Sequence, residues 1–113
     1  MNIHRTEIFG PVVCIMKADS LHDAIEVING HQYSNAASIY TQSGFHARGF
    51  KLKARCGMIG VNVGIPAPVP FLPFGGVNNS MLGDIKMQGK SAIRFFTQEK
   101  VIVERYWEET NAG

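Results

Sequence analysis

Short apolar runs alternate with helix-forming segments in the first half of this 113-residue chain, and this alternation constrains its fold more than any other feature. The continuous apolar run at 11–16 is typical of a strand buried on both faces. Runs at 36–40 and 58–63 predict two more strands, and helices are predicted between the three at 20–30 and 45–55. Strands and helices of this length, in alternation, imply right-handed parallel crossovers. The sequence therefore predicts an α/β fold built on a parallel βαβαβ sheet.

The predicted helices carry their own end signals. Ser20 and Asp23 have the spacing of a capping box, and Gly30 is well suited to end the first helix. Apolar residues recur at helical spacing in both segments: Leu21, Ala24, Ile25 and Ile28 in the first, and Ala47, Phe50 and Ala54 in the second. Each helix therefore has one apolar face.

The segment 64–79 differs in kind from what precedes it. Its prolines, at positions 66, 68, 70 and 73, exclude both a helix and a central strand. Apolar residues interleave with these prolines, which argues against a disordered linker, so we predict an ordered loop that lines a site. Beyond it, a helix is predicted at 89–98, with Ile93 and Phe96 facing inward, and a last strand at Val101–Trp107.

Composition excludes several classes of function. The net charge is +2, and no cluster of Lys and Arg interleaves with aromatic residues, which argues against a nucleic-acid partner. No apolar stretch approaches the roughly 20 residues that span a bilayer, so no membrane association is expected. Hydrophobic residues make up 45% of the chain, which is high for a small isolated unit. We therefore expect part of its surface to pack against other segments or a partner subunit.

Two cysteines, Cys14 and Cys56, form no disulfide framework, and free thiols in a reducing cytoplasm are the expectation. The polar and turn residues near the N-terminus interrupt any signal-peptide core. The four histidines, His4, His22, His31 and His46, show no metal-ligand spacing. We predict that they are surface residues and that the chain holds no metal.

The segment Glu7-Ile8-Phe9-Gly10-Pro11 is the strongest motif. The motif resembles the E-x-F-G-P signature of the aldehyde dehydrogenase superfamily. In an extended segment Glu7 and Phe9 project to the same side, where a carboxylate can accept hydrogen bonds from ribose hydroxyls and an aromatic ring can support a nicotinamide, which suits the role that the resemblance implies. A surface glutamate beside a core phenylalanine is the ordinary alternative.

Further segments resemble the same family in the same order along the chain. Gly57–Asn62 is similar to its Gly-x-x-x-Val-Asn strand, and Pro73–Gly76 to its Pro-Phe-Gly-Gly turn. Thr97–Val101 is similar to the end of its Tyr-Thr-x-x-Lys-x-Val pattern, with Phe96 in place of the tyrosine. The resemblance covers essentially the whole chain.

The resemblance implies roles for named residues. Glu7 and Phe9 would bind the ribose and nicotinamide of NAD, and Phe74 would stand near the reacting aldehyde. Residues 1–99 would be the C-terminal portion of a catalytic domain, within which the Pro-rich loop 63–79 walls the substrate channel. Residues 100–113 would form an oligomerisation strand and tail, with homo-oligomer contacts through Val101–Trp107.

The Pro-rich stretch 61–70 looks most like the methylmalonate-semialdehyde dehydrogenases, the CoA-acylating branch. This implies oxidation of (methyl)malonate semialdehyde to an acyl-CoA through a cysteine thioester, with coenzyme A as co-substrate. Gly64 and Ala67 depart from the branch pattern, as does 77–79. The alternative is that the prolines merely stiffen a surface loop.

The resemblance also implies that most of the enzyme is absent. The family's catalytic cysteine and glutamate precede the E-x-F-G-P segment, so we expect no catalytic residue here and no activity without the N-terminal part. Cys14 falls in a predicted buried strand, and Cys56 at a helix C-terminus whose dipole disfavours a thiolate. Because no targeting signal is recognised, we expect the enzyme in the cytoplasm, or in the mitochondrial matrix if it comes from a eukaryote.

Two alternatives to this hypothesis stay open. In the first, the chain is a non-catalytic α/β ligand-binding or interaction module. In the second, it is part of an aldehyde dehydrogenase of another substrate branch. The upstream reading frame discriminates the first, because a dehydrogenase requires an in-frame dinucleotide-binding domain with an active-site cysteine.

Overall fold

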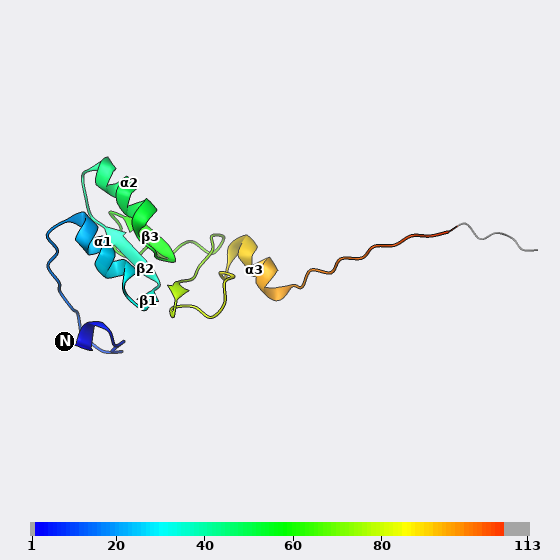
Figure 1. Ribbon diagram of the computed structural model, residues 1–113, viewed down its shortest axis with the longest axis horizontal. Helices are drawn as coiled ribbons and strands as arrows, with labels where there is room; N and C mark the ends of the chain where they lie inside the picture. The colour runs from blue at the N-terminus through cyan, green and yellow to red at the C-terminus, as the bar shows by residue number, and fades with distance from the viewer. Residues whose placement is uncertain (1, 108–113) are drawn as a thin grey trace, which may run out of the picture.

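Two parallel strands, β2 (Ala36–Ile39) and β3 (Met58–Val61), form the sheet at the centre of the chain. The computed structural model describes residues 2–107 (Figure 1). Helix α2 (Gly44–Lys53) makes the crossover between the two strands, as the alternating pattern predicts. The prediction of an α/β fold with a parallel sheet is confirmed.

One face of this sheet is covered by α1 (Leu21–Asn29) and α2, and the core lies there. Ile25 of α1 and Phe50 of α2 are 2% and 3% exposed, which makes them the most deeply buried side chains of the described residues. Alternate strand residues reach the same core because side chains on a strand alternate between faces: Ala37 and Ile39 from β2 and Ile59 from β3. Complete burial of one such side chain stabilises the fold by about 1.5–3 kcal/mol.

Side chains fix two helix ends, of which the sequence predicts the first. The Ser20 hydroxyl accepts a hydrogen bond from the Asp23 amide at 3.1 Å, which confirms the N-cap. Asn29, at the end of α1, also holds the end of α2. Its amide donates to the Lys53 carbonyl at 3.0 Å, and its side-chain oxygen accepts from the Arg55 amide at 2.8 Å.

The Pro-rich loop crosses the other face of the sheet. A Cβ on Gly60 would lie 2.6 Å from the Val63 side chain and 3.1 Å from that of Pro66, so the loop is packed directly on β3. Further along, β4 (Val77–Asn78) pairs antiparallel with β1 (Tyr33–Ser34) in a second two-stranded sheet, which joins the end of the loop to the residues just before β2. The prediction of an ordered loop is therefore correct.

Helix α3 (Gly89–Phe96) begins where the loop is tied back on itself. The Gly89 amide donates to the Pro70 carbonyl at 3.1 Å. The prediction that Ile93 and Phe96 face inward is wrong, because they are 66% and 82% exposed. No described segment packs over them.

Two predicted strands are absent from residues 2–107. The segments 11–16 and 101–107 have no ladder partner, and their apolar side chains lie open: Val13 is 83% exposed and Val103 is 90% exposed. An extended segment becomes a strand only when another backbone pairs with its N–H and C=O groups, and no described segment does so. Figure 1 shows the residues after α3 running away from the rest of the chain.

The N-terminal segment contains one short 3₁₀ turn, η1 (Asn2–His4). No helix within residues 2–107 is long and apolar enough to cross a membrane. The last part of the predicted oligomerisation tail, 108–113, lies outside the described residues.

Candidate functional site

Glu7 and Phe74, far apart in the sequence, line one cavity of about 570 Å³. The N-terminal segment, the start of the sheet and the end of the Pro-rich loop all contribute to its wall. Its other lining residues are mostly polar: Thr6, His31, Tyr33, Asn35, Ala36, Asn79 and Ser80. The cavity therefore combines one carboxylate with amide and hydroxyl groups and a single phenylalanine ring.

Phe74 is held by backbone pairing on one side and by glycines on the other. Its amide donates to the Met87 carbonyl at 2.7 Å, and the Met87 amide donates back at 2.9 Å. A Cβ on Gly57 would lie 2.0 Å from the Gly75 carbonyl oxygen, so the Phe-Gly-Gly turn and the start of β3 approach closely only because position 57 lacks a side chain. The Lys86 ammonium group also donates to the Gly57 carbonyl. The turn is thus fixed against the sheet.

Phe9 lies outside this cavity lining and is 98% exposed. It is the central residue of a tight turn in which the Gly10 amide donates to the Ile8 carbonyl, and a second turn follows, in which the Val12 amide donates to the Gly10 carbonyl, both at 2.8 Å. The structure therefore brings Glu7 together with Phe74, but leaves Phe9 in the open.

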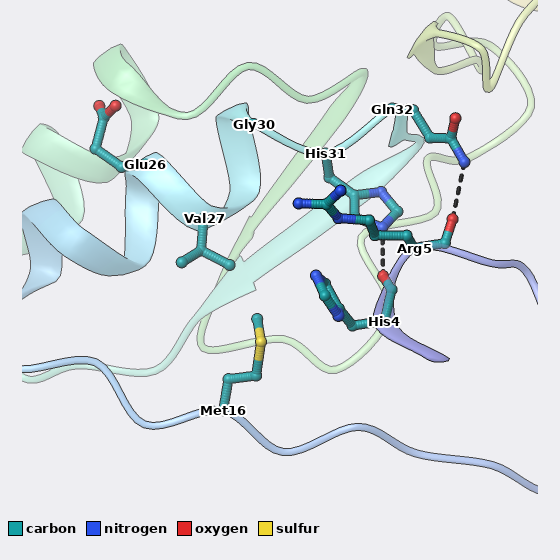
Figure 2. A pocket seen from close by; sticks show the side chains of 8 residues that line it. All are labelled: His4, Arg5, Met16, Glu26, Val27, Gly30, His31 and Gln32. Carbon is teal, nitrogen blue, oxygen red and sulfur yellow. Dashed lines mark hydrogen bonds between the residues drawn. The ribbon is translucent and has the colours of Figure 1, made fainter. Parts of the chain in front are cut away.

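A second cavity, of about 550 Å³, lies where the N-terminal segment meets the end of α1 (Figure 2). His31 Nε2 lies 2.7 Å from the His4 carbonyl oxygen, and the Gln32 side-chain amide donates to the Arg5 carbonyl at 2.8 Å. Both contacts lie two to three residues before Glu7. They connect the predicted cofactor segment to the turn that leads into β1.

His31 is the residue that sequence reasoning missed. It is half-buried and hydrogen-bonded at both ring nitrogens, so the prediction of a surface histidine is wrong for this residue. Its main partner is 27 residues away in the sequence, and no local pattern signals a contact at that distance. His4 is half-buried as well, whereas His22 and His46 are exposed as predicted.

Cys56 lies just past the end of α2, as predicted, whereas Cys14 does not have the surroundings expected of it. Cys14 is exposed, which corrects its prediction as a buried strand residue, because the strand that would bury it has no partner. Cys56 is half-buried, with its sulfur 3.4 Å from the Ser34 hydroxyl. Neither lines the cavity of Glu7 and Phe74. Within residues 2–107 no three His, Cys, Asp or Glu side chains come together as a metal site would require.

The segment after α3 exposes a row of apolar and aromatic side chains. The Arg105 guanidinium carbon lies 4.0 Å from the centroid of the Trp107 ring, a cation–π contact. The hydrogen bond that the Tyr106 hydroxyl donates to the Glu104 carboxylate raises the pKa of Tyr106 above its ordinary value. These contacts are local, between residues two apart in the chain.

The family model described as "Aldehyde dehydrogenase family" matches residues 1–102. The chain belongs to the aldehyde dehydrogenase family. A malonate-semialdehyde dehydrogenase from Pseudomonas aeruginosa is 42% identical to it over 106 residues, which cover 94% of this chain and 21% of the relative. This chain thus spans about a fifth of the length of the curated relatives that it matches.

Solved structures of the family resemble the same part of the chain. A methylmalonate-semialdehyde dehydrogenase from Oceanimonas doudoroffii superposes with a TM-score of 0.86 at 37% identity, covering 94% of this chain and 22% of that one. An aldehyde dehydrogenase from Mycobacterium tuberculosis, in complex with NAD⁺, gives a TM-score of 0.76 at 35% identity, with coverages of 88% and 20%. The resemblance to methylmalonate-semialdehyde dehydrogenases is confirmed, and NAD is a cofactor within the family.

Proposed function

We propose that this chain is the C-terminal portion of an NAD-dependent aldehyde dehydrogenase of the methylmalonate-semialdehyde type. The observation that carries the proposal is the shared cavity of Glu7 and Phe74, the one predicted to face the cofactor and the other the aldehyde. A non-catalytic module would have no need to bring these two motifs to one place.

The cavity lining suits the ribose end of a nicotinamide nucleotide. A ribose presents neighbouring hydroxyl groups, and a carboxylate such as that of Glu7 accepts hydrogen bonds from two of them. The amides of Asn35 and Asn79 and the hydroxyl of Ser80 add donors and acceptors around it. NAD, when bound, supplies the acceptor for the hydride removed from the aldehyde.

In this proposal the residues of this chain bind and orient the cofactor and the substrate, and none of them transfers a proton or forms a covalent bond. Glu7 fixes the ribose, the open ring of Phe9 supports the nicotinamide, and Phe74 with the Pro-rich loop walls the aldehyde side. A cysteine from the rest of the enzyme would add through its sulfur to the aldehyde carbon, and its thiol proton would pass to the aldehyde oxygen. Loss of a hydride from that carbon and of the proton from its oxygen would leave a thioester. The thiol of coenzyme A would then displace the cysteine, which regains a proton on its sulfur, and form the acyl-CoA.

The segment 101–107 is proposed to pair with a second subunit in a homo-oligomer. Its residues Val101, Ile102 and Val103 are 89%, 67% and 90% exposed, and its backbone pairs with no described segment. An extended apolar segment of this kind adds readily to the edge of a neighbouring sheet. We accordingly propose a division into a catalytic portion at 1–99 and an oligomerisation segment from residue 100. The two unpaired cysteines favour a reducing compartment, the cytoplasm or the mitochondrial matrix.

A chimera tests the proposed function. Residues 1–113 would replace the matching segment of the Pseudomonas aeruginosa relative, and NADH formation would be followed with malonate semialdehyde, with and without coenzyme A. We expect activity from the chimera, none from the 113-residue chain alone, and loss of nucleotide affinity on Glu7→Gln. Aldehyde oxidation by the chain alone would overturn the proposal, and so would a folded chimera that binds no NAD. Oxidation without an acyl-CoA product would assign the chain to another substrate branch.

A further inference from the structure

We propose that His31 and Gln32 are positioning residues, which hold the Glu7 segment and the Phe74 loop in a fixed relation to each other. The inference rests on the proposed function for the role of Glu7, but the contacts themselves are properties of this chain. They lie at the turn between α1 and β1, beside the second cavity (Figure 2), and His31 also lines the cavity of Glu7 and Phe74.

The geometry at His31 requires a proton on Nε2. That nitrogen lies 2.7 Å from the His4 carbonyl oxygen, which can only accept a hydrogen bond. The other nitrogen, Nδ1, lies 3.1 Å from both the amide and the carbonyl oxygen of Tyr33, so it accepts from the amide when it carries no proton and donates to the carbonyl when it does. The backbone of Tyr33, at the start of β1, therefore sets the orientation of the ring, and the ring in turn holds the carbonyl of residue 4.

Gln32 connects to both segments at once. Its side-chain amide donates to the Arg5 carbonyl at 2.8 Å, while its own backbone carbonyl accepts from the Asn79 amide at 3.1 Å. Asn79 directly follows β4, which ends the loop that carries Phe74. Gln32 thus links Arg5, just before Glu7, with Asn79, at the end of the loop that carries Phe74.

The N-terminal segment has little else to hold it. Among residues 2–107, the two bonds from His31 and Gln32 are the only hydrogen bonds that join 2–18 to the rest of the chain. Both are accepted by backbone carbonyls, so they fix the course of the chain whatever the side chains at positions 4 and 5 are. Without them, Glu7 has no fixed place opposite Phe74.

Gln32→Glu tests the proposal with almost no change of shape, because the carboxylate cannot donate to the Arg5 carbonyl. Gln42→Glu is the matched control, since Gln42 is exposed and makes no side-chain hydrogen bond within the described residues. His31→Phe, with His46→Phe as its control, removes the other donor while it keeps a ring. NMR on the 113-residue chain would measure contacts between the position 31 and 32 side chains and residues 4–7. Affinity for NAD and the midpoint of unfolding would be measured on the chimera.

We expect Gln32→Glu and His31→Phe to lose the contacts to residues 4–7 and to weaken NAD binding about tenfold, the size of one or two net hydrogen bonds. The controls should do neither, and the midpoint of unfolding should stay the same in all four. Retained contacts in Gln32→Glu and His31→Phe would overturn the positioning role. The positioning role would also be overturned if Glu7→Gln weakens NAD binding while Gln32→Glu and His31→Phe leave it unchanged. If Gln32→Glu and His31→Phe lose the contacts, but neither these variants nor Glu7→Gln change the affinity for NAD, the positioning role stands and the proposed function of Glu7 is overturned.

Discussion

The central unit formed by α1, α2 and the β2–β3 sheet differs from the two segments that flank it, 2–18 and 97–107. In the central unit every predicted element forms, and its apolar faces meet in a core around Ile25 and Phe50. In the flanking segments the sequence is equally apolar, yet the predicted strands are unpaired and their side chains exposed. A helix satisfies its own backbone, whereas a strand depends on a neighbour, so the two kinds of region respond differently to a missing partner.

The sharpest way to break this comparison is to remove the core ring of α2. Phe50→Ala should lower the free energy of unfolding by about 3–5 kcal/mol, because it leaves a cavity in the core. Phe45→Ala is the matched control on the same helix, where the ring is 83% exposed and the loss should stay below about 0.5 kcal/mol. Urea unfolding followed by circular dichroism measures both, and equal losses would show that the core does not lie where the structure places it.

A second test addresses the contact between the sheet and the Phe-Gly-Gly turn. Gly57→Ala should destabilise the chain by about 1–3 kcal/mol or displace the turn, because the new Cβ would lie 2.0 Å from the Gly75 oxygen. Gly49→Ala has nothing within 4 Å of its Cβ and lies inside α2, so it should stabilise by about 0.5–1 kcal/mol. Thermal melts give both values. If Gly57→Ala were neutral and left the Phe74 NMR signals in place, the loop would not be packed as described.

The two hydrogen bonds from Asn29 to the end of α2 offer a smaller effect. Asn29→Ala removes the side-chain partners of the Lys53 carbonyl and the Arg55 amide, and should lower the free energy of unfolding by about 1–2 kcal/mol. His22→Ala is the control on α1, since that side chain is exposed and makes no hydrogen bond within residues 2–107. Hydrogen exchange at the Arg55 amide should quicken in Asn29→Ala alone. Unaltered exchange there would contradict the capping role.

The flanking segments should show the reverse behaviour. Val103→Lys should change the stability of the isolated chain by less than about 0.5 kcal/mol, since the side chain is 90% exposed. In the chimera the same substitution should weaken subunit assembly, measured by sedimentation, because a lysine would enter a buried interface. Val27→Lys, on an exposed part of α1, is the control for the added charge. An assembly that tolerates Val103→Lys would remove the proposed interface.

The smallest effect concerns titration of the same segment. The hydrogen bond to Glu104 raises the pKa of Tyr106, so the protonated phenol is favoured in the folded chain. Any stability from this bond is present below the ordinary tyrosine pKa of about 10 and is lost as pH rises through the raised value. Glu104→Gln should move the pKa of Tyr106 down toward the ordinary value in an ultraviolet titration of tyrosinate. Tyr33→Phe and Tyr40→Phe, made together in the chain with Glu104 and in the chain with Glu104→Gln, leave Tyr106 as the single tyrosine. If its titration curve is the same with Glu104 and with Gln at that position, the hydrogen bond is excluded.

Local patterns in the sequence were sufficient for α1, where Ser20 caps the helix and Gly30 follows its last turn. They were also sufficient for the ordered loop, because prolines limit the backbone whatever surrounds it. They failed for Ile93 and Phe96, whose helical spacing is amphipathic although no described segment covers them. Periodicity reveals which face of an element can be buried, but not whether a partner is present.

The order of α1, β2, α2, β3 and α3, the cap of α1 and the membership in a dehydrogenase family were determined by the sequence itself, because each depends on residues close together in the chain. The meeting of Glu7 with Phe74 and the bonds from His31 and Gln32 that bring it about were decided only by the tertiary structure. Those bonds run from side chains to backbone carbonyls in a segment far away in the sequence. Every residue has a backbone carbonyl, so the sequence does not indicate which of them a given side chain will bind.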